Sequence, residues 1–241
     1  MRAETRHQLK QDRFSRATIG AAEATVHWTV EHKSKLILGG VVLAVLLAAG
    51  FGGWYYLNQQ DQRASVQLNQ AVRTLDTSVR PAGAPAEPDL PSFASAKERA
   101  AQAHKQFQTI VDSFPHTRTA EFARYFLALT SSQLGDNAAA ERGLKDVASS
   151  HNDDLAALAK MALATVYRNA NRTKDAIDVY NALIAKPTRS VGKATAQMEL
   201  AETYRSSQQP AEAKRIYEQM QKENPASEVA QFATQKLQEL K

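Results

Sequence analysis

The sequence predicts an all-α protein in which a single N-terminal transmembrane helix is followed by a solenoid of helical hairpins. Three observations lead to this fold class. Residues 36–57 form one long uncharged apolar run, the residues after 95 are rich in helix formers such as Ala, Glu, Lys, Leu, Gln and Arg, and a pattern of alanines and tyrosines recurs at a fixed spacing. An Ala-rich, charged body with few glycines and prolines is typical of helical structure.

The apolar run reads LILGGVVLAVLLAAGFGGWYYL and carries no charged side chain over its 22 residues. A helix rises about 1.5 Å per residue, so a run of this length crosses the roughly 30 Å hydrocarbon core of a bilayer. Trp54, Tyr55 and Tyr56 close the run, where aromatic side chains favour the membrane interface. The alternative is a signal peptide cleaved near Ala48 and Ala49, but the 35 residues before the run far exceed a usual basic leader. We therefore expect an uncleaved anchor in the lipid bilayer.

The distribution of charge predicts the orientation of this anchor. Residues 1–35 carry seven Lys or Arg against four acidic side chains, and Lys33 and Lys35 flank the start of the run. Because basic segments stay on the cytosolic side, we expect residues 1–35 in the cytosol and the rest of the chain across the membrane. In a bacterium this means the inner (cytoplasmic) membrane, with the repeats in the periplasm. Residues 13–32 are either a short amphipathic helix on the inner membrane surface or a loosely ordered tail.

Small residues recur every four positions within the apolar run and share one helix face. They are Gly40, Ala44, Ala48 and Gly52. Such a stripe lets a second helix approach closely, so it is the predicted membrane-helix interface, and a homo-oligomer is one outcome. Glycine and alanine are also common in membrane helices that pair with nothing.

Between the anchor and the repeats the sequence predicts a stalk and a linker. Residues 58–79 keep helical spacing without Pro or Gly, so we expect the membrane helix to continue into solvent as a stalk. Residues 80–96 contain half of the prolines in the chain, at positions 81, 85, 88 and 91. This composition predicts an extended linker or an ordered loop.

The remainder of the chain repeats itself. Residues 162–187 align with residues 199–225 at a displacement of 37, a weaker copy covers residues 126–148, and half a copy covers residues 103–115. The aligned pairs of the two clearest copies are Ala164 and Ala201, Tyr167 and Tyr204, Ala176 and Ala213, and Tyr180 and Tyr217. We expect about three hairpins with flanking helices over residues 97–241, closed by a capping helix at residues 227–240.

Each residue type in this pattern has a structural role. The alanines let the two helices of a hairpin pack closely, and the tyrosines fill the space between hairpins. Pro187 and Pro225 end the second helices because proline cannot continue the hydrogen-bond ladder. Pro210 suits the first turn of a helix, where its missing N–H costs nothing.

These repeats resemble the tetratricopeptide repeat family. The residues that carry the resemblance are the Leu-Ala and Tyr of each first helix and the Ala-x3-Tyr/Phe and final Pro of each second helix, over roughly residues 97–225. The resemblance implies stacked hairpins whose first helices line a concave surface for other proteins or peptides. Two departures are repeats of 36–37 residues in place of about 34, and Ser131 in place of a first-helix aromatic residue.

Helical spacing selects a predicted partner-binding groove on the first helices. Its members are Phe122, Tyr125, Leu129, Leu158, Met161, Arg168, Asn169, Met198 and Arg205. Methionines suit loosely specified apolar ligands, and Arg168 or Arg205 could bind a carboxylate. The alternative is that several apolar members belong to the interhelical core. Thr165 and Glu202 occupy turns where carboxylate-clamp members of the family carry Lys and Asn, so capture of a chaperone C-terminus is not expected.

Nothing in the sequence predicts catalysis, a metal or a cofactor. The six histidines show no metal-ligand spacing, and neither a phosphate-binding nor a nucleophile motif occurs. Asp153 and Asp154 fit a helix start, where carboxylates favour the dipole. The chain has no cysteine, which excludes disulfides and thiolate sites. Because much of the formal charge of +5 lies in the tail, the repeat region is nearly neutral and no nucleic-acid partner is expected.

A cytosolic tail, one anchor, a stalk and an exported repeat array together resemble the membrane-anchored periplasmic repeat proteins related to the ancillary subunit of the Sec translocon. The resemblance implies a scaffold in the cell envelope with translocon subunits, exported chains or chaperones as partners. Two alternatives remain open. One is an envelope-assembly or cell-division coordinator that uses the same groove, and the other is a homo-oligomeric structural membrane protein joined through its anchor and stalk.

Overall fold

The computed structural model describes residues 33–81, 83, 92–223 and 225–240. The chain divides into two compact parts, one up to Leu57 and one from Asn58 onward. The predicted cytosolic tail and the predicted helix at residues 13–32 lie outside the described residues, apart from the last few positions of the tail.

The first described element is α2 (Lys33–Asp76), a helix of 44 residues that contains the whole apolar run. Up to Leu57 its large apolar side chains, from Ile37 onward, are between 44% and 67% exposed. By length and composition α2 is, among the described residues, the helix that could cross a membrane. Within the described residues, the most apolar part of this helix is left uncovered.

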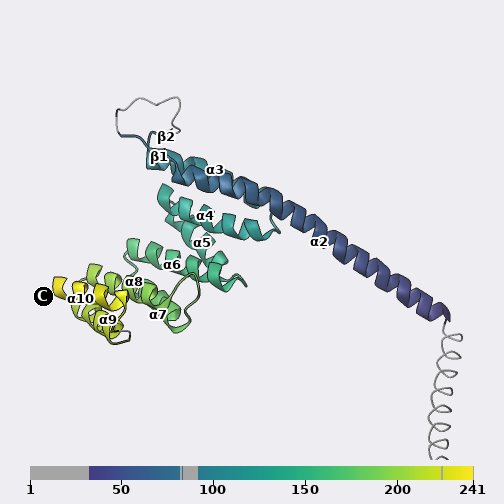
Figure 1. Cartoon of the computed structure of the whole chain (residues 1–241). Helices are drawn as coiled ribbons and strands as arrows, with labels where there is room; N and C mark the ends of the chain where they lie inside the picture. The colour runs from purple at the N-terminus through teal and green to yellow at the C-terminus, as the bar shows by residue number, and fades with distance from the viewer. Residues whose placement is uncertain (1–32, 82, 84–91, 224, 241) are drawn as a thin grey trace, which may run out of the picture. The chain divides into compact units, whose positions relative to one another are not determined.

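From Asn58 onward the chain forms a stack of antiparallel helices, drawn from blue through teal and green to yellow in Figure 1. After the end of α2, the described helices are α3 (Ala96–Ser113), α4 (Arg118–Leu134), α5 (Asn137–Ala148), α6 (Asp153–Asn169), α7 (Thr173–Ala185), α8 (Lys193–Ser206), α9 (Pro210–Glu223) and α10 (Glu228–Glu239). Each helix packs against the next one in sequence. This arrangement confirms the predicted helical-hairpin solenoid, which includes the hairpins α4–α5, α6–α7 and α8–α9.

The helices begin and end where the local sequence satisfies their free backbone groups. Five helices start with a side chain that accepts a hydrogen bond from the amide three residues later: Ser95, Thr117, Asp136, Asn152 and Ser227. Gly135 ends α4 with a φ of 93°, a left-handed conformation that favours glycine. Pro210 is the first residue of α9, as predicted.

The repeated alanines and tyrosines form the core. The four aligned alanines are completely buried, and Tyr180, Tyr217 and Tyr167 are at most 6% exposed. Tyr204, the fourth tyrosine, is half-buried and contacts two neighbouring core clusters. The small side chains therefore lie where helices approach each other, and the large ones fill the remaining volume.

The structure differs from the prediction of a solvent-exposed stalk. Ala64 and Ala71 of α2 are completely buried and form one apolar cluster with Phe107 and Ile110 of α3 and Ala123 of α4. The backbone amide of Thr119 also donates to the Asp61 carboxylate at 2.9 Å. Residues 58–76 are therefore part of the solenoid and serve as the first helix of a hairpin completed by α3.

The predicted linker is tied at both ends by a feature that the sequence did not predict. Residues Ser78–Val79 (β1) pair in parallel with Ser92–Phe93 (β2). The Arg80 amide donates to the Phe93 carbonyl at 3.0 Å, and the Arg99 guanidinium donates to the Thr77 carbonyl at 3.0 Å. The chain therefore leaves α2 and enters α3 at nearly the same place.

Candidate partner-binding groove

The predicted groove residues lie on the first helices of the hairpins, α4, α6 and α8. None of the nine is fully buried. Phe122, Asn169 and Arg205 are exposed, with Phe122 at 37%, and the other six are half-buried. The half-buried apolar members also pack against the interhelical core, as the alternative expected, while part of each side chain stays exposed.

The half-buried apolar members each have one side in the core. Tyr125, Leu129, Leu158 and Met161 pack against the large central cluster, and Met198 packs against the C-terminal cluster. Burial raises the pKa of the Tyr125 hydroxyl above its ordinary value, so this side chain stays neutral. These residues present partial apolar surface on a rigid support, which suits an extended apolar segment.

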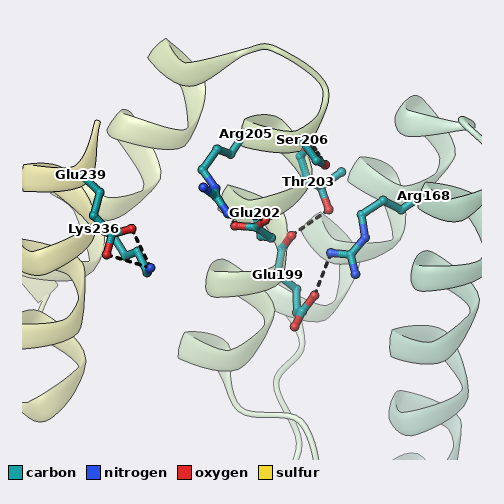
Figure 2. A network of polar contacts seen from close by, with 8 residues as sticks. All are labelled: Arg168, Glu199, Glu202, Thr203, Arg205, Ser206, Lys236 and Glu239. Carbon is teal, nitrogen blue, oxygen red and sulfur yellow. Dashed lines mark hydrogen bonds and ion pairs between the residues drawn. The ribbon is translucent and has the colours of Figure 1, made fainter. Parts of the chain in front are cut away.

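Arg168 of α6 is held by an ion pair that crosses between hairpins. Its guanidinium donates to the Glu199 carboxylate of α8 at 3.0 Å (Figure 2). The Arg168 side chain is 25% exposed and that of Glu199 is 40% exposed, so water screens the pair and its stabilisation is modest, about 0–1 kcal/mol. The pair links α6 of one hairpin to α8 of the next.

Arg205 is paired within its own helix. Its guanidinium donates twice to the Glu202 carboxylate, both times at 2.8 Å. Hydrogen bonding from Arg205 is the main reason that the pKa of Glu202 lies below its ordinary value. Both arginines predicted to bind a carboxylate therefore already hold one, which argues against a groove that selects a free carboxylate.

The ionic network continues onto the capping helix. Lys236 of α10 donates to Glu239 at 2.7 Å and its positive charge contributes to the lowered pKa of Glu202 (Figure 2). Three basic and three acidic side chains of α6, α8 and α10 thus form three ion pairs. The predicted groove residues of α4 and α6 are mainly apolar, and the charged side chains towards the C-terminal end are paired.

A buried hydroxyl lies under this polar end. Tyr180 of α7 is completely buried, and its hydroxyl has no hydrogen-bond partner with good geometry among the described residues. The neighbouring hydroxyls of Thr165 and Thr203 donate to backbone carbonyls of their own helices. Burial is the main reason that the pKa of Tyr180 is raised.

The predicted membrane-helix interface has no partner among the described residues. Gly40, Ala44, Ala48 and Gly52 are all exposed, and a Cβ added at Gly40 or Gly52 would meet nothing within 4 Å. The small-residue stripe therefore stays a predicted interface with a second membrane helix.

Three members of the polar network were not predicted from the sequence. Glu199 lies three residues before Glu202, so helical spacing could have placed it on the same face of α8. Lys236 and Glu239 belong to a capping helix that the repeat pattern does not extend to. Asp153 and Asp154 do lie in the first turn of α6, as predicted, and they also bind Lys186 and Ser190 of the α7–α8 loop.

Comparison with known proteins places this architecture in a family. Residues 26–241 match the tetratricopeptide repeat-like domain, and the chain belongs to that family. Repeats of this kind generally serve as scaffolds for protein–protein interaction. No curated protein matches the sequence.

Solved structures support the fold. A tetratricopeptide repeat protein from Parabacteroides merdae is 15% identical with a TM-score of 0.50, and the match covers 74% of this chain and 60% of that protein. Putative kinesin light chain TPR-like repeats from Podosopora anserina are 17% identical with a TM-score of 0.55, covering 75% of this chain and 86% of that one. A single-substitution form of the same repeats gives 17% identity and a TM-score of 0.54 over 75% and 85% of the two chains. At this identity the likeness shows the fold alone.

Proposed function

We propose that this protein is a single-pass scaffold of the cell envelope, which uses an anchored repeat groove to hold apolar segments of other proteins during export or transfer to periplasmic chaperones. The observation that carries the proposal is that α2 contains both a fully uncovered apolar run and a segment built into the repeat core. One helix thus supplies both the anchor and the first helix of the array.

The uncovered surface of α2 supports membrane insertion. About thirteen large apolar side chains of this run are exposed. Burial of each one in a bilayer would stabilise the protein by roughly 1.5–3 kcal/mol relative to its exposure to water. The family match begins at residue 26 and includes this run together with the repeats. Both observations favour an anchor that stays with the protein.

The groove supports an apolar, extended occupant. Its exposed and half-buried members are mainly apolar or thioether side chains, and its two arginines are neutralised by Glu199 and Glu202. The terminal carboxylate of a bound peptide would gain little binding free energy here, because Arg168 and Arg205 are already paired with glutamates. The export role itself rests on the architectural resemblance and on the exported placement expected for the repeats.

The topology is tested by single-cysteine labelling, which is clean because the chain has no cysteine. Cysteines are introduced at Ser15 in the tail and at Asn137 in the repeats, and intact Gram-negative cells are treated with a membrane-impermeant maleimide that passes the outer membrane. We expect labelling at residue 137 only, and labelling at residue 15 only after lysis. Labelling of both positions in intact cells, or release of the protein by alkaline carbonate, would refute the anchor.

The groove is tested by affinity for an extended apolar peptide. Met161→Glu with Met198→Glu places two charges on the groove, and Ala182→Glu with Ala211→Glu places two charges on exposed positions of α7 and α9 as the matched control. We expect fluorescence anisotropy with the full chain in detergent to show weaker binding only for the groove variant. Equal affinity of the two variants would mean that the occupant binds elsewhere.

A further inference from the structure

The repeats share one position at which α4 lacks the large side chain of the other first helices. This position holds Tyr167 in α6 and Tyr204 in α8, and both side chains contact the central core cluster. In α4 the same position holds Ser131, whose hydroxyl donates to the Leu127 carbonyl of its own helix at 2.9 Å. The first helix of this hairpin therefore has no ring to fill the space that a tyrosine fills in the next two.

The second helix of the same hairpin is reduced in the same way. Gly143 of α5 stands where the repeat has Val179 in α7 and Ile216 in α9, and both of these contact the central cluster as well. Ser131 and Gly143 together line a cleft of about 230 Å³ between α3, α4 and α5. A cavity of about 150 Å³ is large enough to hold a benzene molecule, so this cleft has room for an aromatic ring.

The next hairpin shows which surroundings a ring takes at this position. The guanidinium of Arg172 lies 4.1 Å from the centroid of the Tyr167 ring, and the Lys145 amine lies 6.0 Å from it. Cations are attracted to the face of an aromatic ring. The cleft also has a guanidinium in its wall, that of Arg124, which donates to the Pro115 carbonyl at 2.7 Å. An aromatic side chain therefore suits the cleft better than an aliphatic one.

The cleft lies on a different side of α4 from the predicted groove. Successive residues of a helix are turned by about 100°, so Arg124, Ala128 and Ser131 share one side, and Tyr125 and Leu129 share another. The other walls come from α3 and α5, which are the second helices of their hairpins. A segment bound in the cleft would therefore contact residues other than those of the groove.

We propose that this cleft, the α3–α5 cleft, binds one aromatic side chain of a partner protein segment that lies across α3 and α5. The bound ring fills the volume that Tyr167 and Val179 fill in the next hairpin, with Arg124 beside its face. Gln108 and Asp146 line the cleft and are exposed, so they offer an amide and a carboxylate to the backbone of the segment. The inference rests on neither the proposed anchor nor the proposed groove.

The test uses disulfide exchange with the full chain in detergent, because the chain has no cysteine of its own. One cysteine is introduced at Gln108 or, as the control, at Ala182, an exposed position of α7. The protein is equilibrated with a reducing agent and short cysteine-containing peptides that differ in one side chain, tyrosine, leucine or alanine, and the retained peptide is measured by intact mass spectrometry. At residue 108 we expect the tyrosine peptide to be retained about tenfold better than the alanine peptide and about threefold better than the leucine peptide. At residue 182 we expect similar retention of all three.

Two matched variants place the same new ring on different sides of α4. Ser131→Tyr fills the cleft with a ring of the chain's own, so it should abolish the preference for the tyrosine peptide at residue 108 without lowering the thermal midpoint. Ser132→Tyr adds the ring at the neighbouring position on the groove side and should leave the preference unchanged. Arg124→Ala removes the cation without filling the cleft, so it should remove the advantage of tyrosine over leucine.

Equal retention of the three peptides at residue 108, or a preference that survives Ser131→Tyr, overturns the cleft as a binding site. A leucine peptide that is retained as well as the tyrosine peptide overturns the aromatic assignment. Met161→Glu with Met198→Glu changes the groove and should leave the preference at residue 108 unchanged, so failure of the cleft and failure of the groove are distinguished.

Discussion

The contact between α4 and α5 depends on the absence of one methyl group. Gly143 lies in the interior of α5, and a Cβ added there would sit 2.9 Å from the Ala128 Cβ and 3.7 Å from the Ala128 Cα. Ala128 is 3% exposed and belongs to the central core cluster. Because its Cβ is attached directly to the backbone, relief requires α4 and α5 to move apart.

Two opposite effects decide the stability of Gly143→Ala. Replacing a helical glycine by alanine stabilises by about 1 kcal/mol through helix propensity. Overpacking of a well-packed contact costs about 1–3 kcal/mol. We therefore expect a net loss of about 1 kcal/mol in the free energy of unfolding. Ala128→Gly removes the opposing methyl group, so the double variant should recover about 1–2 kcal/mol relative to the sum of the single changes.

The assay is urea unfolding of the full chain in detergent, followed by circular dichroism at a helical wavelength. Ala138→Gly, at an exposed position of α5, calibrates the propensity effect in the same helix. Stabilisation by Gly143→Ala, or additivity of the two single variants within about 0.5 kcal/mol, would show that α4 and α5 are not in the close contact described.

Three further outcomes follow from the core and its titrating groups. Asp61→Ala removes the acceptor of the Thr119 amide and should lower the unfolding free energy by about 1.5–3 kcal/mol, whereas Asp76→Ala, at an exposed position of the same helix, should change it little in the same urea assay. Tyr180→Phe removes a buried hydroxyl without a partner among the described residues and should be neutral or stabilising in thermal unfolding, and a loss above about 1 kcal/mol would reveal a hydrogen bond at that hydroxyl. Burial raises the pKa values of Tyr125, Tyr180 and Tyr217 above 10.0, so the folded state retains protons that the unfolded state loses. Stability should therefore decline as the pH rises above about 10, and urea midpoints that stay constant from about pH 9 to 11 would contradict this.

The repeat pattern predicted the positions of the central helices because the spacing of the repeated residues shows where each hairpin begins and ends. The displacement of 37 between Tyr167 and Tyr204 and between Tyr180 and Tyr217 placed α6 to α9 correctly, and the buried alanines lie where the pattern put them. A position that recurs in each hairpin reports the same packing environment each time. The fold was therefore predictable where the repeats are clear.

The sequence could not show what covers an amphipathic helix. Ala64, Leu68 and Ala71 form an apolar stripe that fits a free stalk, a coiled coil or a packed helix equally well. Only the folded chain shows that α3 and α4 cover it. The pair of two-residue strands was missed for a related reason, since so short a pairing leaves no period in the sequence.

The exposure of the predicted groove residues followed from helical spacing, but the charge pairing around them did not. Helical spacing correctly placed Met161 and Met198 on partly exposed faces of α6 and α8. The pairing of Arg168 with Glu199 joins residues 31 apart in different hairpins, and its distance depends on how those hairpins stack. For this reason a carboxylate-binding role was open from the sequence and is disfavoured by the structure.

The central claim, that the anchored groove holds segments of other envelope proteins, is tested most directly by photocrosslinking in living cells. A photoreactive residue replaces Met161 in the full chain, and the same residue at Ala182, an exposed position of α7, serves as the control. The account predicts adducts from residue 161 with translocon subunits, exported chains or chaperones, and few of these from residue 182. Adducts only with further copies of this chain, or the same adducts from both positions, would contradict it.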